Sequence, residues 1–553
     1  MSKVHALQES TPSPLRRTVV FCKHSRVYTI GFVLNLILIP FKAYISEPLP
    51  WTVKSVTLNT TWLDAKDATS FDKFATATVA FLAAKYNYET VPPNRVFLKD
   101  ANSYVLRFTL ALPPTGDDNC VHHMHRFPGA LLYSHGTAKF VCTFVGRNTT
   151  TRFLYPMHQC QYDTFAGVNF AVSCTWATTM PSSDEATYAF YHGVQLLVTP
   201  SFTWMVFCVR CGLFGFILHT LWRQYYRHYG PLATNLATFG LDERCALYVI
   251  QLGDPASIVL SHPFVSLVMV LDCLVNCAYA GAANSRASQL TDVGQFCLGC
   301  LYGSRTVWAS YMAMRYATPL LKSMQWEKYF DPVDPGMMAL TVSFYAGPLV
   351  YLMSRTPFVW VFQWLNSIAL PLDQTEARLD AGPGLLFLLV VLATVPIVNS
   401  FVAQSIHRRR TRLGRSATEK FVTTHFNDWK HRFLFRFRCL DQCSRNEGGT
   451  LYRIFGENPR YKKVPLVSTR GSDCFIYGWD ETAGAFVHQV RLSLIHVALD
   501  TQTTCPALVI PICPTTHPTY AANVIDAQVC AKSPLPPSQK ILHRGANNCQ
   551  WMK

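Results

Sequence analysis

The stretch LLFLLVVLATVPIV, residues 385–398, decides the fold class because it contains no charged residue. It lies in a longer apolar segment from Gly384 to Ile406, and a membrane-spanning helix needs about 20 mostly apolar residues. The composition of the whole chain agrees with a membrane location. Of its 553 residues, 50% are hydrophobic and 15% are charged, against about 25% charged in an ordinary soluble domain. We therefore expect an integral membrane protein.

Outward from this segment, five more stretches are apolar enough, or nearly so, to cross a bilayer. They cover residues 27–45, 200–222, 258–281, 293–317 and 337–353. The fourth of the six contains Arg305 and several polar residues, so a buried or interfacial helix is its alternative interpretation. The first lacks a small-residue cleavage site and is too long for a signal-peptide core, which favours a signal anchor. The sequence thus predicts a polytopic α-helical protein with six spans, the first at 27–46 and the other five within 200–406.

Positive charge sets the predicted orientation. Lys and Arg cluster in the segment 1–26, after the second span, between the fourth and fifth spans, and after the sixth. The positive-inside rule places all these clusters, and both termini, in the cytosol. The two N-x-[ST] acceptors, Asn59 and Asn148, fall between the first and second spans, on the predicted lumenal side where glycosylation takes place. We expect a glycoprotein of the plasma membrane or of a secretory endomembrane.

Residues 47–199 are long enough for one folded lumenal or extracellular domain. A capping box at Thr69 predicts a helix to about Tyr86. Strand-like runs follow at residues 104–112, 130–133, 139–145, 152–155 and 168–176, which predicts an α+β domain. Its four cysteines are Cys120, Cys142, Cys160 and Cys174. An even number in an oxidising compartment predicts two disulfides with the pairing open, and one bridge or four buried thiols are the alternatives.

A local histidine cluster, His122, His123 and His125, has two interpretations. Histidine suits a metal site or a proton sensor, since its ordinary pKa is about 6.5. The spacing fits no standard zinc pattern, and a solvated loop is the simpler interpretation. We expect neither a bound metal nor a cofactor.

Ionisable residues within the predicted spans are costly to insert and usually face a partner or a water-filled cavity. Arg210, Asp272 and Arg305 lie at similar depth, which predicts a buried Arg–Asp pair. The second arginine then shares Asp272 or faces water, and Asn276, one turn beyond Asp272, extends the network. Such a network serves either gating and transport or the fixed locking of three helices.

Between the last two spans, residues 357–370 are apolar and aromatic but too short to cross. They predict a re-entrant or interfacial helix. Asp373, Glu376 and Asp380 follow, and an acidic ring could attract cations if several copies of the chain assemble around an axis. A belt helix with a solvated acidic loop is the alternative.

The cytosolic tail begins with a basic juxtamembrane segment, residues 407–449. Residues 407–438 alone hold ten Lys or Arg and two acids, including the group Arg408, Arg409, Arg410, Arg412 and Arg415. Such a segment attracts anionic lipid at the cytosolic face, and we expect no nucleic-acid partner. A small β-rich domain is predicted at 450–525 and a disordered tail at 526–553.

No nucleotide-binding, metalloprotease or hydrolase motif occurs in the chain, so we do not expect an enzyme or catalytic residues. The order of predicted elements over residues 27–406 resembles that of polycystin and mucolipin channels. The shared features are cytosolic termini, six spans, a large glycosylated domain after the first span, and a short helix between the last two. This resemblance implies an ion channel or transporter and assigns no residues, because no filter motif of those families follows Leu370. A non-catalytic receptor or scaffold is the alternative.

Overall fold

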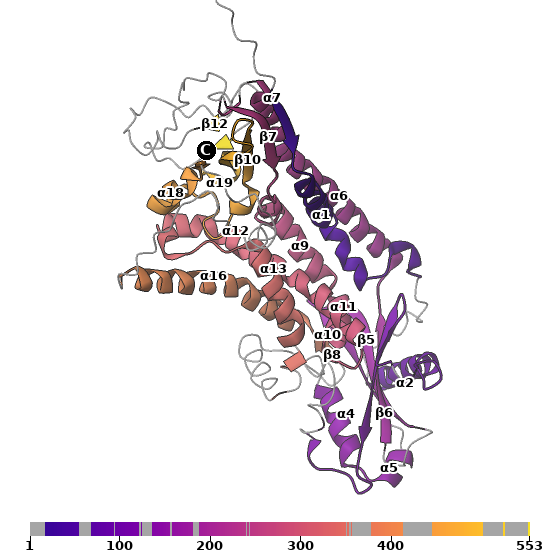
Figure 1. Cartoon of the computed structure of the whole chain (residues 1–553). Helices are drawn as coiled ribbons and strands as arrows, with labels where there is room; N and C mark the ends of the chain where they lie inside the picture. Colours follow the sequence, from indigo (N-terminus) through magenta and orange to yellow (C-terminus); the bar gives the residue numbers. More distant parts are fainter. Residues whose placement is uncertain are drawn as a thin grey trace, which may run out of the picture.

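The computed structural model describes residues 17–54, 68–92, 95–120, 123, 135–154, 158–180, 187–238, 240–242, 244–349, 351–352, 356, 378–412, 445–500, 524–525 and 551–552. Two β-sheets lie at opposite ends of a body of helices (Figure 1). We call the seven-stranded sheet the first sheet and the six-stranded sheet the second sheet.

The first sheet collects strands from distant parts of the chain, in the order β1-β7-β10-β11-β13-β12, with β9 paired to β11. Its strands are β1 (Thr18–Phe21), β7 (Cys245–Gln251), β9 (Arg445–Gly448), β10 (Cys474–Asp480), β11 (Ala485–Leu494), β12 (Val524–Ile525) and β13 (Trp551–Met552). Helix α7 (Tyr229–Thr238) contributes to the hydrophobic core of this sheet. The predicted domain 450–525 is therefore one part of a larger unit, because β1 and β7 complete its sheet.

The chain end also belongs to the first sheet. Trp551 and Met552 pair with Leu494 and Ser493, and both side chains are buried. The prediction of a disordered segment 526–553 does not hold for these two residues, because burying an indole removes a large apolar area from water.

The second sheet has the order β2-β3-β6-β5-β4-β8. Its strands are β2 (Phe97–Lys99), β3 (Ser103–Ala111), β4 (His158–Phe165), β5 (Val168–Thr179), β6 (Thr187–Leu196) and β8 (Arg378–Asp380). Helix α2 (Ala68–Lys85), close to the range expected from the capping box, packs over Trp176 and Tyr191. Strand β8 comes from far along the chain and pairs in parallel with β4, so this unit extends beyond the predicted range 47–199.

Two strand predictions in this region are wrong. Residues 139–145 belong to helix α4 (His135–Gly146). Phe140, Val141, Phe144 and Val145 are buried, a spacing of three to four residues that lines one face of a helix. Thr149–Leu154 form the short helix α5 at the predicted strand 152–155.

The helical body connects the two sheets. Its elements are α1 (Lys23–Ile37), η1 (Ile39–Ile45), η2 (Pro50–Thr52), α6 (Pro200–Gln224), η5 (Tyr226–His228), α8 (Ala256–Leu260), α9 (Pro263–Val275), α10 (Cys277–Ala287), α11 (Val293–Gly303), η6 (Ser304–Thr306), α12 (Val307–Ser323), η7 (Glu327–Tyr329), α13 (Pro335–Phe344), η8 (Tyr345–Leu349) and α16 (Gly382–Arg412). The C-terminal region adds α18 (Thr450–Glu457), η9 (Pro459–Tyr461), η10 (Arg470–Ser472) and α19 (Ile495–Ala498).

The prediction of six spans is wrong. Within the described residues, two helices are long and apolar enough to cross a membrane, in the ranges Pro200–Ala237 and Gly384–Arg409. The number rises to four only if two bent helix pairs each count as one span. These pairs are Lys23–Ile37 with Ile39–Thr52, bent by 70°, and Pro263–Val275 with Cys277–Ala287, bent by 77°.

The two remaining predicted spans are interrupted. The segment 293–317 divides into α11 and α12 at the 3-10 turn η6, which contains Arg305. The segment 337–353 contains α13, which ends at Phe344, and a π-helical turn with Pro348 follows. Proline removes a helical hydrogen bond, and a short helical piece cannot cover the bilayer core.

The order of the strands explains why four is the upper number of candidate spans among the described residues. The chain visits the first sheet at β1, the second at β2–β6, the first at β7, the second at β8, and the first again from β9. It therefore passes between the two sheets four times. Each passage contains one of the two candidate helices or one of the two bent pairs. The two ends of the described chain, β1 and β13, consequently lie in one sheet.

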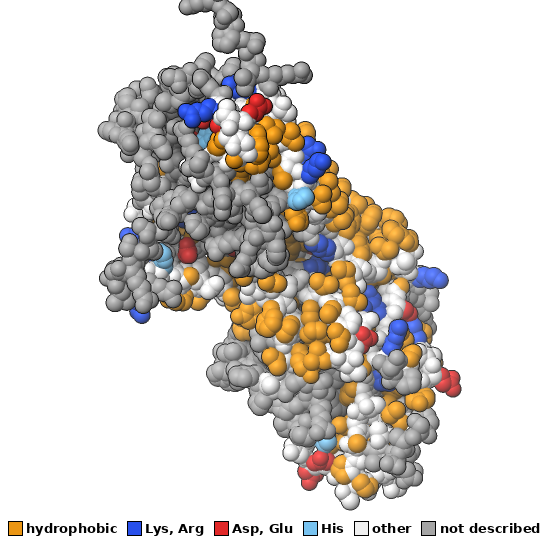
Figure 2. Space-filling model, viewed as in Figure 1, with side chains coloured by type: hydrophobic (Ala, Val, Ile, Leu, Met, Phe, Trp, Pro, Cys, Tyr) orange, Lys and Arg blue, Asp and Glu red, His pale blue; other side chains and the backbone are white. Residues whose placement is uncertain are grey.

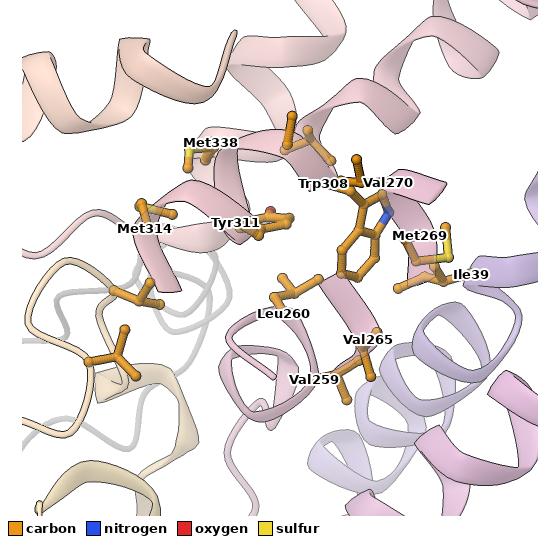
Figure 3. Close-up of a cluster of buried hydrophobic side chains, with 14 of the residues drawn as sticks. Ile39, Val259, Leu260, Val265, Met269, Val270, Trp308, Tyr311, Met314 and Met338 are labelled. Carbon is orange, nitrogen blue, oxygen red and sulfur yellow. The ribbon is translucent and has the colours of Figure 1, made fainter. Parts of the chain in front are cut away.

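Apolar packing and apolar surface both concentrate in the helical body. Trp308 and Tyr311 on α12 gather with Met269 on α9 and Leu260 on α8 in its buried core (Figure 3). Figure 2 shows hydrophobic side chains exposed over the middle of the molecule. Exposed large residues lie on α1, α6 and α16, the helices of three passages. Many large apolar side chains exposed on neighbouring turns of a helix are typical of contact with lipid or another protein.

The glycines of α11 permit close helix packing. A β-carbon at Gly299 would lie 2.7 Å from the backbone oxygen of Ala283 on α10. One at Gly303 would lie 3.1 Å from the β-carbon of Ala346 in η8. This GxxxG sequence therefore brings α11 against two neighbours, as small residues do in membrane helix pairs.

Candidate functional site

Four ionisable side chains meet in the helical body, and we call them the charge cluster: Glu47, Arg210, Asp272 and Arg305. Arg210 is on α6 and Asp272 is on α9. Glu47 follows η1, and Arg305 lies in η6 between α11 and α12. Three of the four thus lie at or near the end of a helical segment, where backbone groups lack helical partners and the chain can turn.

Each arginine of the charge cluster contacts both carboxylates. Arg210 donates from Nε and Nη2 to the two oxygens of Asp272, both at 3.0 Å, and from Nη1 to Glu47 Oε2 at 2.5 Å. Arg305 donates from Nη1 to Glu47 Oε1 at 3.0 Å and from Nη2 to Asp272 Oδ2. The four side chains are only 2–7% exposed. Two positive and two negative charges therefore balance in a buried site.

Neutral groups complete this arrangement. Tyr302 donates its hydroxyl to Glu47 Oε1 at 2.7 Å. Asn276 donates from Nδ2 to the backbone oxygen of Asp272 at 2.9 Å and to its Oδ1 at 3.2 Å. The guanidinium of Arg210 lies 4.9 Å from the ring centre of Tyr44, and that of Arg305 lies 4.8 Å from the ring centre of Tyr302. These contacts supply the hydrogen bonds and cation–π packing that a buried ion network needs.

The structure brings together all four residues that the sequence placed in one network: Arg210, Asp272, Asn276 and Arg305. Neither arginine is left facing water, because a second acid, Glu47, completes the charge balance. Glu47 is not recognisable from the sequence as a member of the network, because it follows the apolar run and counts there as the first residue of the next domain. The signal was the unbalanced charge, since two buried arginines and one buried aspartate require another anion.

The charge cluster is linked to the second sheet through Ser46. The backbone oxygen of Ser46 accepts from Lys99 Nζ on β2. Its hydroxyl accepts from Arg286 Nη1 on α10 at 2.8 Å. Burial, with a contribution from the charge of Arg286, lowers the pKa of Lys99 to about 8. We call Ser46, Lys99 and Arg286 the Ser46 junction, because it ties the residue before Glu47 to the edge of the second sheet.

A cavity of about 270 Å³ lies beside the charge cluster. Arg305 belongs to the cluster and also lines this cavity. Apolar walls come from residues such as Ile39, Leu260 and Trp308, while Ser468 and Gly471 line it from the side of the C-terminal region. The cavity therefore extends from the part of the chain that carries the first sheet toward the buried arginine.

Three buried polar atoms of this cavity lining have no hydrogen-bond partner. They are Arg305 Nε, Ser257 Oγ and Ser468 Oγ. Buried polar groups are nearly always satisfied in folded proteins, so an unsatisfied group needs a water, an ion or a ligand. Each of the three atoms is itself shielded from the cavity space, so these residues line the cavity with their other atoms.

The four cysteines expected in disulfides pair among themselves. Cys120 is bonded to Cys142 and Cys160 to Cys174, with Cα–Cα distances of 5.0 and 4.1 Å. The second pair links directly opposite residues of the antiparallel strands β4 and β5. Both bridges lie on the side of the second sheet. Of the two glycosylation acceptors, Asn148 is exposed just before α5, and Asn59 lies outside the described residues.

The histidine cluster gives no metal site in the described part of the chain. His123 Nε2 lies 2.7 Å from Asp117 Oδ2, whereas His122 and His125 lie outside the described residues. No group of three or more His, Cys, Asp or Glu suited to a metal ion occurs among the residues that the structure describes.

The acids predicted at a pore mouth are only partly described. Asp373, Glu376 and the whole segment 357–370 lie outside the described residues. Asp380 is in β8, where its Oδ1 accepts from the backbone of Gly382 at 2.9 Å. This acid therefore has a local role at the start of α16.

The basic juxtamembrane group is also only partly described. Arg408 donates to the backbone oxygen of Lys328 and stacks over Tyr329 at 4.8 Å. Arg409 lies on α16 as well. Arg410 and Arg412 lie in the last turn of that helix, and the structure does not describe their side chains. Arg415 lies outside the described residues.

A second buried ion pair, which the sequence analysis did not single out, lies in the C-terminal region. Arg491 Nε donates to Asp473 Oδ2 at 2.6 Å, and the hydroxyl of Tyr452 donates to the same oxygen at 2.6 Å. We call these three residues the C-terminal ion pair. Charged residues are frequent in this region, so its sequence gives no signal that marks Asp473 and Arg491 as buried partners.

Comparison of the chain with models of protein families, with curated proteins and with solved structures finds no match, so the argument for function rests on the geometry of the charge cluster and its cavity.

Proposed function

We propose that the chain is a multi-pass membrane protein that moves a small solute or ion, with the cavity and the charge cluster as its binding region. The observation that carries the proposal is the double role of Arg305, which holds both carboxylates of the cluster and lines the cavity. Removing a carboxylate from such a buried arginine typically costs about 3–5 kcal/mol, so a solute can replace it only with an anionic group that takes over the same hydrogen bonds.

The broken helices support this proposal. Asp272 lies one turn before the bend at Asn276, and Arg305 lies in the break between α11 and α12. Glu47 follows the end of η1, nine residues after the bend at Leu38. In many transporters, discontinuous helices meet near the middle of the membrane and their ends form the substrate and ion sites. Short helical pieces can also tilt separately, which a site that opens to one side at a time requires.

The Ser46 junction gives the second sheet a direct connection to the same site. Lys99 on β2 holds the backbone of Ser46, and the next residue, Glu47, holds both arginines. A displacement of the second sheet would therefore pull on the charge cluster. This arrangement suits a domain that senses one side of the membrane and changes the state of the helical body.

For the orientation, we propose that the first sheet is cytosolic and the second sheet is lumenal or extracellular. Both disulfides lie on the side of the second sheet, and disulfides persist in oxidising compartments. The exposed acceptor Asn148 lies on the same side and would carry a glycan. The positive charge near Arg408 would then face anionic cytosolic lipid.

A receptor or scaffold is the second candidate, and the closed charge balance of the cluster favours it. Four charges that satisfy one another lock helices together without any solute. The two candidates differ in one property. A transport protein exposes the cavity to both sides of the membrane at different times, and a scaffold does not.

Cysteine accessibility tests the proposal. Ser304→Cys places a thiol at the cavity lining. The background has serine at the free cysteines that are exposed among the described residues, Cys208, Cys211 and Cys297, and at the cysteines outside the described residues. We expect a membrane-impermeant thiol reagent to modify this cysteine from both sides of sealed vesicles. Leu340→Cys, at an exposed position on α13, is the matched control for reagent that reaches the protein through lipid. Modification from one side only, under all solution conditions, would favour the scaffold.

A further inference from the structure

We propose that the Ser46 junction binds a small monovalent anion, of the chloride type, between Lys99 and Arg286. This inference goes beyond the proposed function, because the site lies at the edge of the second sheet and neither cation lines the cavity beside Arg305. The observation that carries it is an excess of buried positive charge where the second sheet meets the helical body.

Both cations of the junction contact one residue. Lys99 Nζ donates to the backbone oxygen of Ser46, and Arg286 Nη1 donates to its hydroxyl at 2.8 Å. The guanidinium of Arg286 also lies 4.6 Å from the ring centre of Phe97. The ammonium of Lys99 lies 5.5 Å from the ring centre of Tyr279. Two positive charges are therefore held at the same short stretch of chain, where a negative charge between them would relieve their repulsion.

No carboxylate of the described chain balances these two charges. Neither Lys99 nor Arg286 forms an ion pair with a described acid. The acids whose charges act on Lys99 are Glu47 and Asp100. Glu47 is shared by the two arginines of the charge cluster, and Asp100 is paired with Lys85. Buried charges are stabilised by a partner of opposite sign, so the junction favours an anion for the same reason that the charge cluster requires Glu47.

The junction also offers hydrogen-bond donors that the protein does not use. The side chain of Arg286 is buried, and its Nε is fully shielded and has no partner. Its Nη2, in contrast, makes no hydrogen bond with the described residues and keeps some exposed surface. Half-buried Lys99 uses one of its three N–H groups on Ser46, whose hydroxyl keeps its own hydrogen. An anion between the two head groups can therefore accept from both without displacing a hydrogen bond of the protein.

The small number of unused donors favours a halide over an oxyanion. Sulfate or phosphate would bury four oxygens that each need a donor, whereas a single spherical ion is satisfied by the N–H groups of Arg286 Nη2 and Lys99 Nζ. The cost of removing an ion from water into a buried site also grows with the square of its charge. A monovalent ion is therefore the anion that this junction can hold.

Equilibrium dialysis of radiolabelled chloride against the full chain in detergent, at pH 7, tests the inference. We expect saturable binding of one ion per chain, with competition by bromide and not by sulfate or gluconate at the same concentration. Lys99→Gln should raise the half-saturating chloride concentration at least 10-fold, as expected for the loss of a hydrogen bond from a charged group. Lys54→Gln removes an exposed lysine whose backbone contacts Asn102 beside β3, and this control should bind like wild type.

Thermal unfolding separates anion binding from a structural role of Lys99. At constant ionic strength, the midpoint of the wild type should be higher in chloride than in gluconate, because a ligand that binds only the folded state stabilises it. Lys99→Gln should lose this difference and unfold in gluconate no earlier than the wild type, since its repulsion with Arg286 is gone.

Three results would overturn the proposal. The first is the absence of saturable chloride binding to the wild type, which decides the question even if the variant does not fold. The second is undiminished chloride binding to Lys99→Gln, which would place the ion elsewhere. The third is a midpoint of Lys99→Gln that is lowered equally in both salts, which would show that Lys99 only supports the fold.

Discussion

The charge cluster and the C-terminal ion pair are both buried, but they are built differently. The charge cluster joins four segments of the chain, with Glu47 and Arg305 separated by 258 residues. The C-terminal ion pair joins Asp473 and Arg491, separated by 18 residues within the same part of the first sheet. The charge cluster lies between helical segments, and Arg305 lines the cavity there. Tyr452 of the C-terminal ion pair lines a different cavity, which residues of η7 and of the C-terminal region form. Burial and a neighbouring cavity are therefore common to both sites, and the number of distant chain segments that meet is what distinguishes them.

The comparison indicates how far the loss of each cluster should spread. Removing a member of the charge cluster releases α6, α9 and the α11–α12 turn from one another, because these elements meet at the same four side chains. Removing Asp473 affects β11 and the neighbouring α18 of one domain. The substitutions at the two sites test this difference, from the largest expected effect to the smallest, and the pH dependence of a third buried acid, Asp163, sharpens it.

The largest effect is expected for Glu47→Gln. It leaves two buried arginines with one acid, and breaking a buried pair in this way typically costs about 3–5 kcal/mol. The measurement is the yield and thermal midpoint of the monodisperse protein in detergent. Glu89→Gln, at an exposed position, is the control and should behave like wild type. A Glu47→Gln protein as stable as wild type would mean that the cluster does not hold the helices together.

For Asp473→Asn we expect a smaller loss of about 3 kcal/mol, because the amide oxygen can still accept from Tyr452. The loss should be confined to the first sheet. Limited proteolysis should cut the C-terminal region and leave the segment with the two disulfides intact. Glu481→Gln, exposed at the turn between β10 and β11, serves as the control. Simultaneous cleavage in both sheets would show that the two regions unfold together.

Double-mutant cycles measure whether the two buried ion sites are independent. Glu47→Gln and Arg305→Gln together should be less destabilising than the sum of the single changes, with a coupling of about 2 kcal/mol. Glu47→Gln and Arg491→Gln share no partner and should add to within about 0.5 kcal/mol. A coupling of similar size in the second pair would contradict the separation of the two sites.

Asp163 shows how a buried carboxylate behaves without a cation. It accepts from Gln161 Nε2 at 2.9 Å and from Ser173 Oγ at 3.1 Å, and burial raises its pKa to about 7. Between the ordinary pKa of about 4 and pH 7, the folded state holds a proton that the unfolded state has lost. Stability should therefore fall as the pH rises from 4 to 7, by up to about 1.4 kcal/mol per pH unit.

Denaturant unfolding of the wild type and of Asp163→Asn across this pH range checks the prediction. The contribution of Asp163 should disappear in the variant, which cannot ionise at this position. Equal pH dependence in the two proteins would show that Asp163 is ionised in the folded state throughout.

The smallest effect is expected for Asn276→Ala. It removes hydrogen bonds to Asp272 but leaves both arginine contacts of that carboxylate, so the loss should be about 1 kcal/mol. Asn284→Ala, at a half-buried position within α10, is the comparison for the loss of an amide side chain outside the charge cluster. A loss as large as that of Glu47→Gln would mean that Asn276 holds the bend between α9 and α10.

The sequence determined which residues are incompatible with lipid and which segments are apolar. Arg210, Asp272 and Arg305 stood out because a charge in an apolar segment needs a partner, and that requirement is a property of the residue and its neighbours in sequence. It also predicted that the four cysteines between the first two predicted spans pair among themselves, because they are an even number in a segment expected in an oxidising compartment, and it left the pairing open. Glu47 stood at a boundary where an acid is unremarkable, so nothing local marked it.

Only the tertiary structure decided how the apolar segments are arranged. Apolar composition is the same for a straight span and for two short helices that meet at an angle, and the bends at Leu38 and Asn276 depend on what packs against them. The pairing of β1 with β7 and of β8 with β4 joins segments hundreds of residues apart, and no short pattern encodes such a partner. For the same reason the cavity beside Arg305 exists only in the fold, because its wall is assembled from helices that the chain reaches at widely separated points.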